Sequence, residues 1–189
     1  MKNIDVINGN QAAAIGVKLA RPDVIAAYPI TPQTPLVEYL AQFVANKELD
    51  ARMCEVESEH SAMSVLTGAS LAGARTFTAT SSQGLALMYE PYFRVSTLRL
   101  PIVMAIVNRE MISPQTVWGG PQDSLTLRDA GWLQVYVEDN QEILDMIIQG
   151  FKIAEDERVL LTINVCYDGF YLSHMTERVE IPSQEQVDA

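Results

Sequence analysis

Residues 58–107 read SEHSAMSVLTGASLAGARTFTATSSQGLALMYEPYFRVSTLRLPIVMAIV, and the fold class follows from them. Their pattern predicts a helix over 58–73, a strand over 76–80, a helix over 85–95 and a strand over 102–107. Neither strand shows the alternation of apolar and polar residues that marks a sheet with one face in water. Strands of this kind, separated by helices, are typical of a parallel sheet that helices cover on both faces.

The same alternation of helices and strands continues on both sides of this segment. On the N-terminal side we expect Asn10 to cap one helix and Thr34, with Pro35 at the first helical position, to cap another. Beyond residue 107, Pro114 and the run at 119–121 predict a loop. The remaining expected elements are helix 10–20, strand 24–28, a helix from residue 34, strand 52–56, strand 132–137, helix 141–154 and strand 159–165.

The predicted fold class is therefore α/β, with three layers: a mostly parallel sheet and helices on both of its faces. The sequence contains neither an internal repeat nor a linker-like segment. We expect a single domain over residues 1–182 and a short C-terminal tail over 183–189.

Composition excludes several classes of function. Hydrophobic residues make up 48% of the chain and charged residues 20%, which is the composition of an ordered globular protein. The net charge of −11 would repel a phosphate backbone, so we expect no nucleic-acid partner. No uncharged stretch reaches the roughly 18 residues that a membrane helix needs. The N-terminus lacks the apolar core of a secretory signal, and we expect a cytoplasmic protein without a membrane partner.

Polar residues follow three of the predicted strands, at 28–35, 55–60 and 108–110. Ligands of parallel sheets bind at the carboxyl ends of the strands, so these segments are the candidate site. Glu59 lies in the first turn of a helix, where it is either an ordinary capping acid or a functional carboxylate. Arg109 ends a strand, where it is either a solvated cation or a clamp for a substrate carboxylate. The residues alone do not decide between the two roles of either side chain.

Other familiar kinds of site are not supported. Glu55, Glu57, Glu59 and His60 lack the spacing that turns helical ligands toward one metal ion, so we expect no metal site. Cys54 and Cys166 are far apart in apolar segments, and we expect reduced, buried thiols. The chain contains no Gly-rich dinucleotide fingerprint, no P-loop and no nucleophile elbow.

Five longer segments carry a resemblance to a known family. In order and at normal spacing, they resemble the alpha subunit of 2-oxoacid:ferredoxin oxidoreductases, and within that family the pyruvate type. The resemblance extends over residues 5–182. The segments are YPITPQTP (28–35), VESEHSA (56–62), GASLAGARTFTATSSQGLALM (68–88), LPIVMAIVNR (100–109) and CYDGF (166–170).

The resemblance implies a pyrimidine-binding module of a thiamine-diphosphate enzyme. Glu59 matches the glutamate that hydrogen-bonds the aminopyrimidine ring of the cofactor, a contact that favours the imino tautomer of the ring. Thr31 and Arg109 match the hydroxyl and guanidinium that hold the 2-oxoacid substrate. The adjoining residues Tyr28, Pro29 and Ile30 are expected to contact the cofactor.

The resemblance also implies partners. The chain lacks the family's Gly-Asp-Gly segment for diphosphate and magnesium, and two cysteines cannot ligate an iron–sulfur cluster. We therefore expect these groups on a beta subunit and on iron–sulfur and gamma-type subunits. The expected reaction converts a 2-oxoacid, pyruvate in the first place, and coenzyme A into acyl-CoA and CO2, with electrons passed to ferredoxin.

Two departures from the family bear on what the chain does. The usual alpha subunit continues into a second domain after the segment 168–170, so we expect this chain to be a split subunit or a fragment. Gly120 and Pro121 stand where the family often has an acid and a histidine, which weakens the assignment of pyruvate over a larger 2-oxoacid. Two further functions stay open: a subunit of a different thiamine-diphosphate enzyme, and a non-catalytic scaffold.

Overall fold

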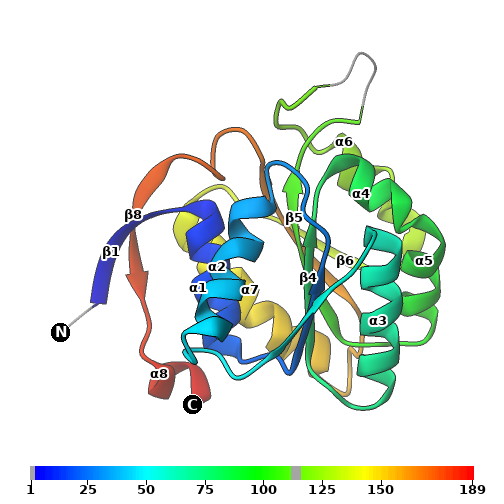
Figure 1. The fold of residues 1–189 in the computed structure, drawn as a ribbon, viewed down its shortest axis with the longest axis horizontal. Coiled ribbons are helices and arrows are strands. Elements are labelled where there is room, and N and C mark those ends of the chain that lie inside the picture. Colours follow the sequence, from blue (N-terminus) through cyan, green and yellow to red (C-terminus); the bar gives the residue numbers. More distant parts are fainter. Residues whose placement is uncertain (1–2, 112–115) are drawn as a thin grey trace.

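The computed structural model describes residues 3–111 and 116–189 (Figure 1). The strands are β1 (Asn3–Asn8), β2 (Val24–Ala27), β3 (Arg52–Glu55), β4 (Thr76–Thr80), β5 (Ile102–Asn108), β6 (Leu133–Tyr136), β7 (Ile163–Asp168) and β8 (Thr176–Ile181). The helices are α1 (Gly9–Ala20), α2 (Thr34–Ala45), α3 (Glu59–Leu71), α4 (Ser82–Leu87), α5 (Tyr89–Thr97), α6 (Gln122–Leu125), the 3-10 turn η1 (Arg128–Ala130), α7 (Asn140–Glu155) and α8 (Gln184–Asp188).

Six strands form one sheet in the order β3-β2-β4-β5-β7-β6, and every neighbouring pair is parallel. All five residues of β4 and all seven of β5 are buried, as the continuous apolar and hydroxyl-bearing runs predict. The predicted α/β class with a mostly parallel sheet is confirmed.

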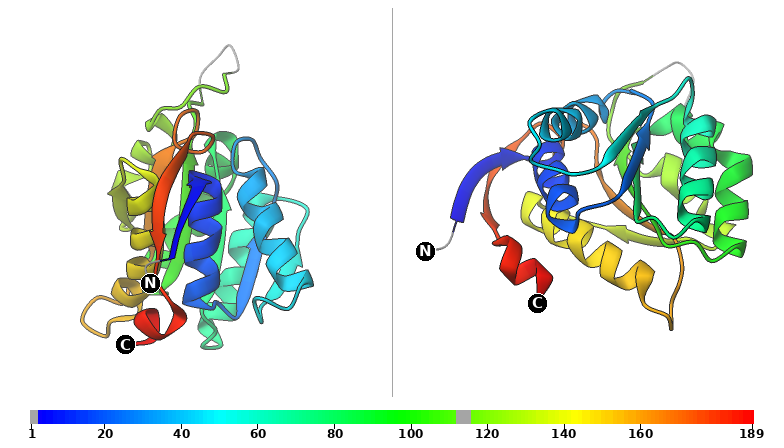
Figure 2. Two further views of the ribbon diagram at one scale, coloured as in Figure 1. Left: turned by 90° about the vertical axis from the view of Figure 1, so that its left-hand side faces the viewer. Right: turned by 60° about the horizontal axis from the view of Figure 1, so that its bottom comes forward.

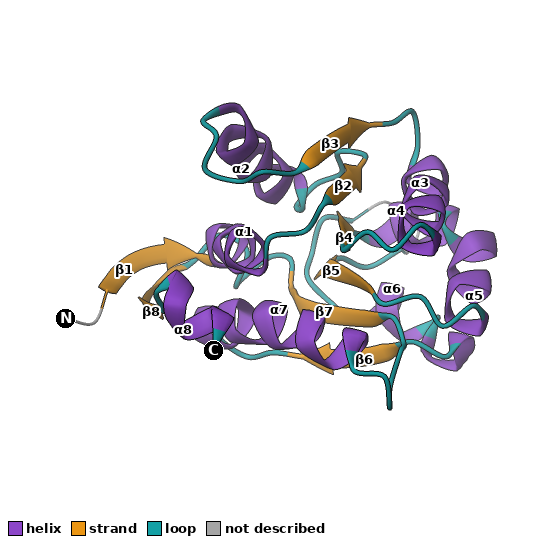
Figure 3. Cartoon of the chain, turned by 90° about the horizontal axis from the view of Figure 1, so that it is seen from below, coloured by secondary structure: helices purple, strands orange, loops and turns teal. Residues whose placement is uncertain are grey.

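Helices cover both faces of this sheet, which gives the three predicted layers (Figures 1 and 3). Helices α1, α2 and α7 pack on one face, where Val17, Leu36 and Ile147 belong to one buried hydrophobic cluster. Helices α3, α4 and α5 lie on the other face, where Leu66 and Leu85 belong to a second cluster. The two clusters lie on opposite faces of the sheet.

The connections after β2 and β4 leave the sheet toward opposite faces. Strand β2 leads to α2 in the first cluster, whereas its neighbour β4 leads to α4 in the second. Neighbouring strands whose connections diverge in this way mark the topological switch point of a parallel sheet, where ligands bind. A site is therefore expected at the loops after β2 and β4.

The two end segments form a ribbon that the sequence pattern did not predict. Strand β1 pairs antiparallel with β8, from Asn3 opposite Ile181 to Asn8 opposite Thr176, apart from the main sheet (Figure 2). Four of the six residues of β1 are exposed, so no apolar run marks it. The predicted tail over 183–189 contains α8, whose cap is Ser183.

Three predicted helix boundaries are wrong. Helix α1 is capped by Asn8, which together with Gln11 makes a capping box, whereas Asn10 is buried. Thr34 is the first residue of α2 and not its cap. The predicted helix over 85–95 is two helices that meet at Met88. The predicted loop residue Pro114 lies outside the described residues.

The last parallel strand begins and ends later than predicted. Residues 157–159 form a turn. The N–H groups of Val159 and Leu160 both bond to the Asp156 carbonyl, and Leu160 has a left-handed φ of 42°. The sequence shows only that Leu160 is apolar, as strand residues often are, and not that its backbone is left-handed. The strand itself is Ile163–Asp168 in place of 159–165.

Candidate functional site

Glu59 is the first residue of α3 and is only 4% exposed. The helix begins here because the Ser58 side chain accepts the N–H of Ser61 at 3.2 Å. Burial raises the pKa of the Glu59 carboxyl, since a charged group loses its hydration there. A carboxyl whose pKa is raised in this way shares a proton with a basic nitrogen of a ligand more readily than an exposed one does.

Gly84 in α4 lies directly against the Glu59 carboxyl. A Cβ added to Gly84 would stand 2.4 Å from both Glu59 Oε1 and Thr80 Oγ1. Real Cβ atoms essentially never come within 3.0 Å of such an atom, so there is no room for a side chain here. Within the part of the chain that the structure describes, the buried hydroxyls of Thr80 and Ser81 have no hydrogen-bond partner. Buried polar atoms normally have one, so this corner has the unused capacity that a polar ligand would satisfy.

Arg109 follows the last residue of β5, and its guanidinium reaches two loops and the first turn of α4. It donates from Nη1 to the Thr31 carbonyl at 2.8 Å, from Nε to the Thr116 carbonyl at 2.8 Å and from Nη2 to Gln83 Oε1 at 3.1 Å. The structure therefore brings the predicted pair Thr31 and Arg109 together, through the main chain of Thr31. A guanidinium has five N–H donors, so these three bonds leave two for an anionic ligand.

The loop after β2 contains Tyr28, Pro29 and Ile30 and lies at this same edge of the sheet. Two buried amides hold it in place: sequence reasoning missed Gln33, and it gave Asn10 a different role as a helix cap. Gln33 donates from Nε2 to the Ala79 carbonyl at 2.7 Å, and Asn10 donates from Nδ2 to the Pro32 carbonyl at 3.0 Å. The loop is thereby anchored on both α1 and β4, while Tyr28 remains 40% exposed.

A further residue missed by sequence reasoning is Asp123 in α6, which is completely buried. Its carboxyl accepts the main-chain N–H groups of Ser82 at 2.9 Å, Arg109 at 3.1 Å and Ser124 at 2.8 Å, and the side-chain amide of Asn108 at 2.7 Å. Burial raises the pKa of Asp123, while these four hydrogen bonds act in the opposite direction. The sequence around Asp123, which follows Gly120 and Pro121, contains no local pattern that predicts a buried carboxyl with four hydrogen bonds.

Residues 15–189 match the model of a protein family described as pyruvate flavodoxin/ferredoxin oxidoreductase, thiamine diphosphate-binding. The chain belongs to this family. The resemblance inferred from the five sequence segments is thereby confirmed.

Among its relatives in the oxidoreductase family, the pyruvate synthase subunit PorA of Methanocaldococcus jannaschii is 61% identical over 187 residues, which cover 99% of this chain and 48% of the relative. The alpha subunit of NADH-dependent phenylglyoxylate dehydrogenase of Aromatoleum evansii is 56% identical, over 99% of this chain and 45% of the relative. The chain thus spans about half the length of these curated relatives.

A solved oxidoreductase structure shares the fold. It is the 2-oxoglutarate:ferredoxin oxidoreductase of Magnetococcus marinus with 2-oxoglutarate, coenzyme A and succinyl-CoA bound, and it matches with a TM-score of 0.87 and 28% identity. The match covers 98% of this chain and 32% of that one. The family's thiamine-diphosphate-binding fold therefore describes this domain.

The acidic residues near Glu59 do not gather around a common point. In residues 3–111 and 116–189, no three His, Cys, Asp or Glu side chains lie close enough together to hold a metal ion. His60 instead faces Glu90 at 3.4 Å, and the Glu57 carboxyl accepts a hydrogen bond from the Ser61 hydroxyl at 2.6 Å.

Both cysteines are free, with Cys166 buried and Cys54 partly buried. Among the described residues, no helix combines the length and hydrophobicity needed to cross a bilayer.

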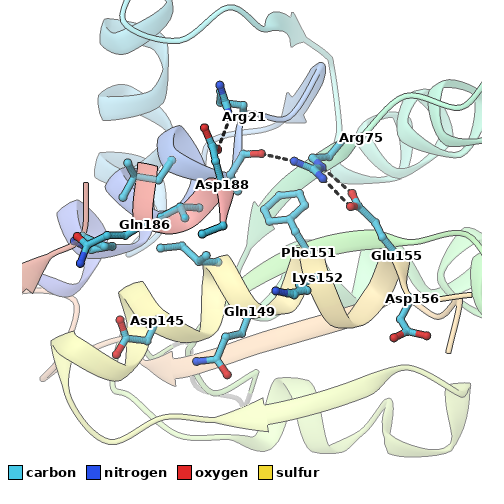
Figure 4. A pocket seen from close by; sticks show the side chains of 16 residues that line it. Arg21, Arg75, Asp145, Gln149, Phe151, Lys152, Glu155, Asp156, Gln186 and Asp188 are labelled. Carbon is cyan, nitrogen blue, oxygen red and sulfur yellow. Dashed lines mark hydrogen bonds and ion pairs between the residues drawn. The ribbon is translucent and has the colours of Figure 1, made fainter. Parts of the chain in front are cut away.

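A cleft of about 950 Å³ lies at the opposite end of this oxidoreductase domain, between α1, α7 and α8 (Figure 4). Four of its charged side chains already pair with one another. Arg75 makes two bonds of 2.6 Å to Glu155, and Arg21 pairs with Asp188. Because these charges already neutralise one another, we do not take this cleft as the functional site despite its size.

Proposed function

We propose that this chain is the pyrimidine-binding component of a thiamine-diphosphate enzyme that oxidatively decarboxylates a 2-oxoacid, pyruvate in the first place, to acyl-CoA and CO2 with electrons passed to ferredoxin. One observation carries the proposal: the short segment 81–84 contacts both halves of the site. Gln83 accepts a hydrogen bond from Arg109, and Gly84 lies against Glu59. A buried acid and an anion-binding guanidinium are thus connected through adjacent residues.

The residues around Glu59 fit the aminopyrimidine ring of the cofactor. Its buried carboxyl has a raised pKa, and the hydroxyls of Thr80 and of the next residue, Ser81, lack partners among the described residues. Glu59 would hold a proton at a ring nitrogen, and Tyr28, Pro29 and Ile30 would contact the ring from the loop after β2. Bound thiamine diphosphate supplies a nucleophilic carbon and accepts the electrons that decarboxylation releases.

Arg109 would bind the carboxylate of the 2-oxoacid. A planar guanidinium suits this task because it can donate two parallel hydrogen bonds to one carboxylate. Its bonds to the Thr31 and Thr116 carbonyls hold the fork in place before a ligand arrives, which lowers the entropic cost of binding. Thr31 would bind the substrate through its hydroxyl, since the hydrogen bond from Arg109 uses only its carbonyl.

The rest of the enzyme would come from partners. Neither a Gly-Asp-Gly segment nor a set of four cysteines is present in the sequence, so the diphosphate, magnesium and iron–sulfur clusters would bind beta, gamma-type and iron–sulfur subunits. The relatives named as alpha or PorA subunits support an assembly of this kind.

The test is to purify the complete assembly and to measure CoA-dependent decarboxylation of pyruvate, a branched-chain 2-oxoacid and phenylglyoxylate. Each substrate is tried with ferredoxin and with NAD⁺ as the electron acceptor, because one 56% identical relative is named as NADH-dependent. We expect the highest kcat/KM with pyruvate and ferredoxin. Failure to decarboxylate any 2-oxoacid in the presence of thiamine diphosphate would contradict the proposal.

A further inference from the structure

We propose that Asp123 is a positioning residue that fixes Arg109 and the segment 81–84 relative to each other, and so couples substrate binding to the geometry around Glu59. The inference rests on the proposed function. The hydrogen bonds of Asp123 carry it, because a single carboxylate oxygen accepts a hydrogen bond from each of the two segments.

The Oδ2 atom of Asp123 is shared between two strand ends. It accepts the N–H of Ser82, just after β4, at 2.9 Å and the N–H of Arg109, just after β5, at 3.1 Å. Ser82 and Arg109 thereby lie at a fixed separation at the carboxyl edge. A shift of either segment would break one of the two bonds.

The Oδ1 atom holds the carboxyl itself in place. It accepts Asn108 Nδ2 at 2.7 Å and the N–H of Ser124 at 2.8 Å. All four partners are donors, so only an ionised carboxylate, which accepts and does not donate, satisfies them all. An asparagine at this position would turn its NH2 group toward one of the two donor pairs.

Ser82 shows why this anchor is needed. Its φ of 47° is left-handed, a conformation that a residue with a Cβ rarely adopts and that persists only when its surroundings fix it. Besides the bond to Asp123, its hydroxyl donates to the Glu110 carbonyl at 2.9 Å. Both contacts tie the start of α4 to the segment around Arg109, and Gln83 and Gly84 follow directly.

The experiment uses the complete protein assembled with its partner subunits and compares four forms: wild type, Asp123→Asn, Arg109→Ala and the double variant. Isothermal titration measures the affinity for oxamate, an unreactive analogue with the carboxylate of pyruvate. We expect Asp123→Asn to weaken oxamate binding by about 10-fold, the lower end of the effect of losing a hydrogen bond to a charged group. In the Arg109→Ala background the same change should weaken it by less than about 2-fold.

A residue that only stabilises the fold would give a different result. Its loss would lower the melting temperature without changing the affinity of the folded protein, or would act equally in both backgrounds, and either outcome would overturn the proposal. Glu155→Gln is the matched control, because the Glu155 carboxylate also accepts hydrogen bonds, two from Arg75, but lies at the opposite end of the domain. It should lower stability and leave oxamate affinity unchanged.

A second variant covers the case in which Asp123→Asn fails to assemble. Asn108→Ala removes one donor from Oδ1 and should weaken oxamate binding in the same direction by about 3-fold, again only when Arg109 is present. An unchanged affinity in that variant would count against the proposal.

Hydrogen–deuterium exchange separates this inference from the proposed function. In Asp123→Asn, peptides that contain Ser82 and Arg109 should exchange faster together, whether or not the enzyme uses a 2-oxoacid. If wild type binds no oxamate but the two peptides still loosen together, the proposed function fails and the positioning role stands. If only one of them loosens, Asp123 does not couple the two segments.

Discussion

Replacing Gly84 with alanine is the sharpest test of the contact between α4 and Glu59. The new Cβ would stand 2.4 Å from Glu59 Oε1, whereas ordinary van der Waals contacts begin at 3.4 Å. The carboxyl must therefore move by about 1 Å, because Gly84 is held in a helix and Glu59 is buried. A misplacement of about 1 Å in a site can cost roughly 100-fold in rate.

We therefore expect Gly84→Ala to slow proton exchange at the reactive carbon of bound thiamine diphosphate by about 100-fold in the assembled enzyme. Rapid-quench exchange followed by proton NMR measures this rate directly. Overpacking should also lower the free energy of unfolding, by about 1–3 kcal/mol.

Gly68→Ala is the matched control, since Gly68 is also helical and an added Cβ there meets no described atom within 4 Å. Alanine should stabilise α3 by roughly 0.5–1 kcal/mol and leave the exchange rate unchanged. Wild-type exchange in Gly84→Ala would refute the reasoning, because it would mean that the Glu59 carboxyl does not set the reactivity of the cofactor.

Three further predictions concern single residues. In steady-state kinetics of the assembly, Arg109→Ala should lower kcat/KM for pyruvate by roughly 10- to 150-fold, and Arg109→Lys should recover only part of this loss. Thr31→Ala keeps the carbonyl that Arg109 contacts and should cost less than about 12-fold. An unchanged kcat/KM in Arg109→Ala would mean that Arg109 is a solvated cation at the rim of the sheet. Burial raises the pKa of Glu59, so folded wild type should lose stability as the pH rises above the usual glutamate range. Over that interval the melting temperature of Glu59→Gln should rise relative to that of wild type. Melting temperatures of the two proteins that change in parallel with pH would contradict this. Burial also raises the pKa of the Cys166 thiol, so iodoacetamide should modify Cys54 well before Cys166 in the folded chain. Peptide mass spectrometry measures the two rates of modification. Equal rates would be inconsistent with a buried Cys166 thiol.

The parallel sheet was predictable because its central strands are continuous runs of buried residues. Strand β5 and the helix that begins at Glu59 follow from local sequence, since an apolar run and a Ser58 cap are local signals. The pairing of β1 with β8 joins opposite ends of the chain, and the exposed residues of β1 give no pattern for it.

The candidate site was predictable only in part, for the same reason. Glu59, Thr31 and Arg109 come from the resemblance and from strand ends. In the structure Arg109 donates hydrogen bonds to both Thr31 and Gln83. The positions of Asp123 and Gly84 depend on contacts between segments that are distant in sequence. Neither the left-handed Ser82 nor the buried carboxyl beside it leaves a periodic signal.

The all-parallel order of the sheet also has a consequence for how the chain reaches its native state. Strand β5 is buried along its whole length between β4 and β7, yet β7 begins only at Ile163, more than fifty residues after β5 ends. Non-local pairing of this kind is slow, and until it is complete an uninterrupted apolar strand remains open on one edge. A nascent or refolding chain would therefore be most vulnerable to self-association through Ile102–Asn108. Low protein concentration during refolding should matter more for this domain than for one built from hairpins.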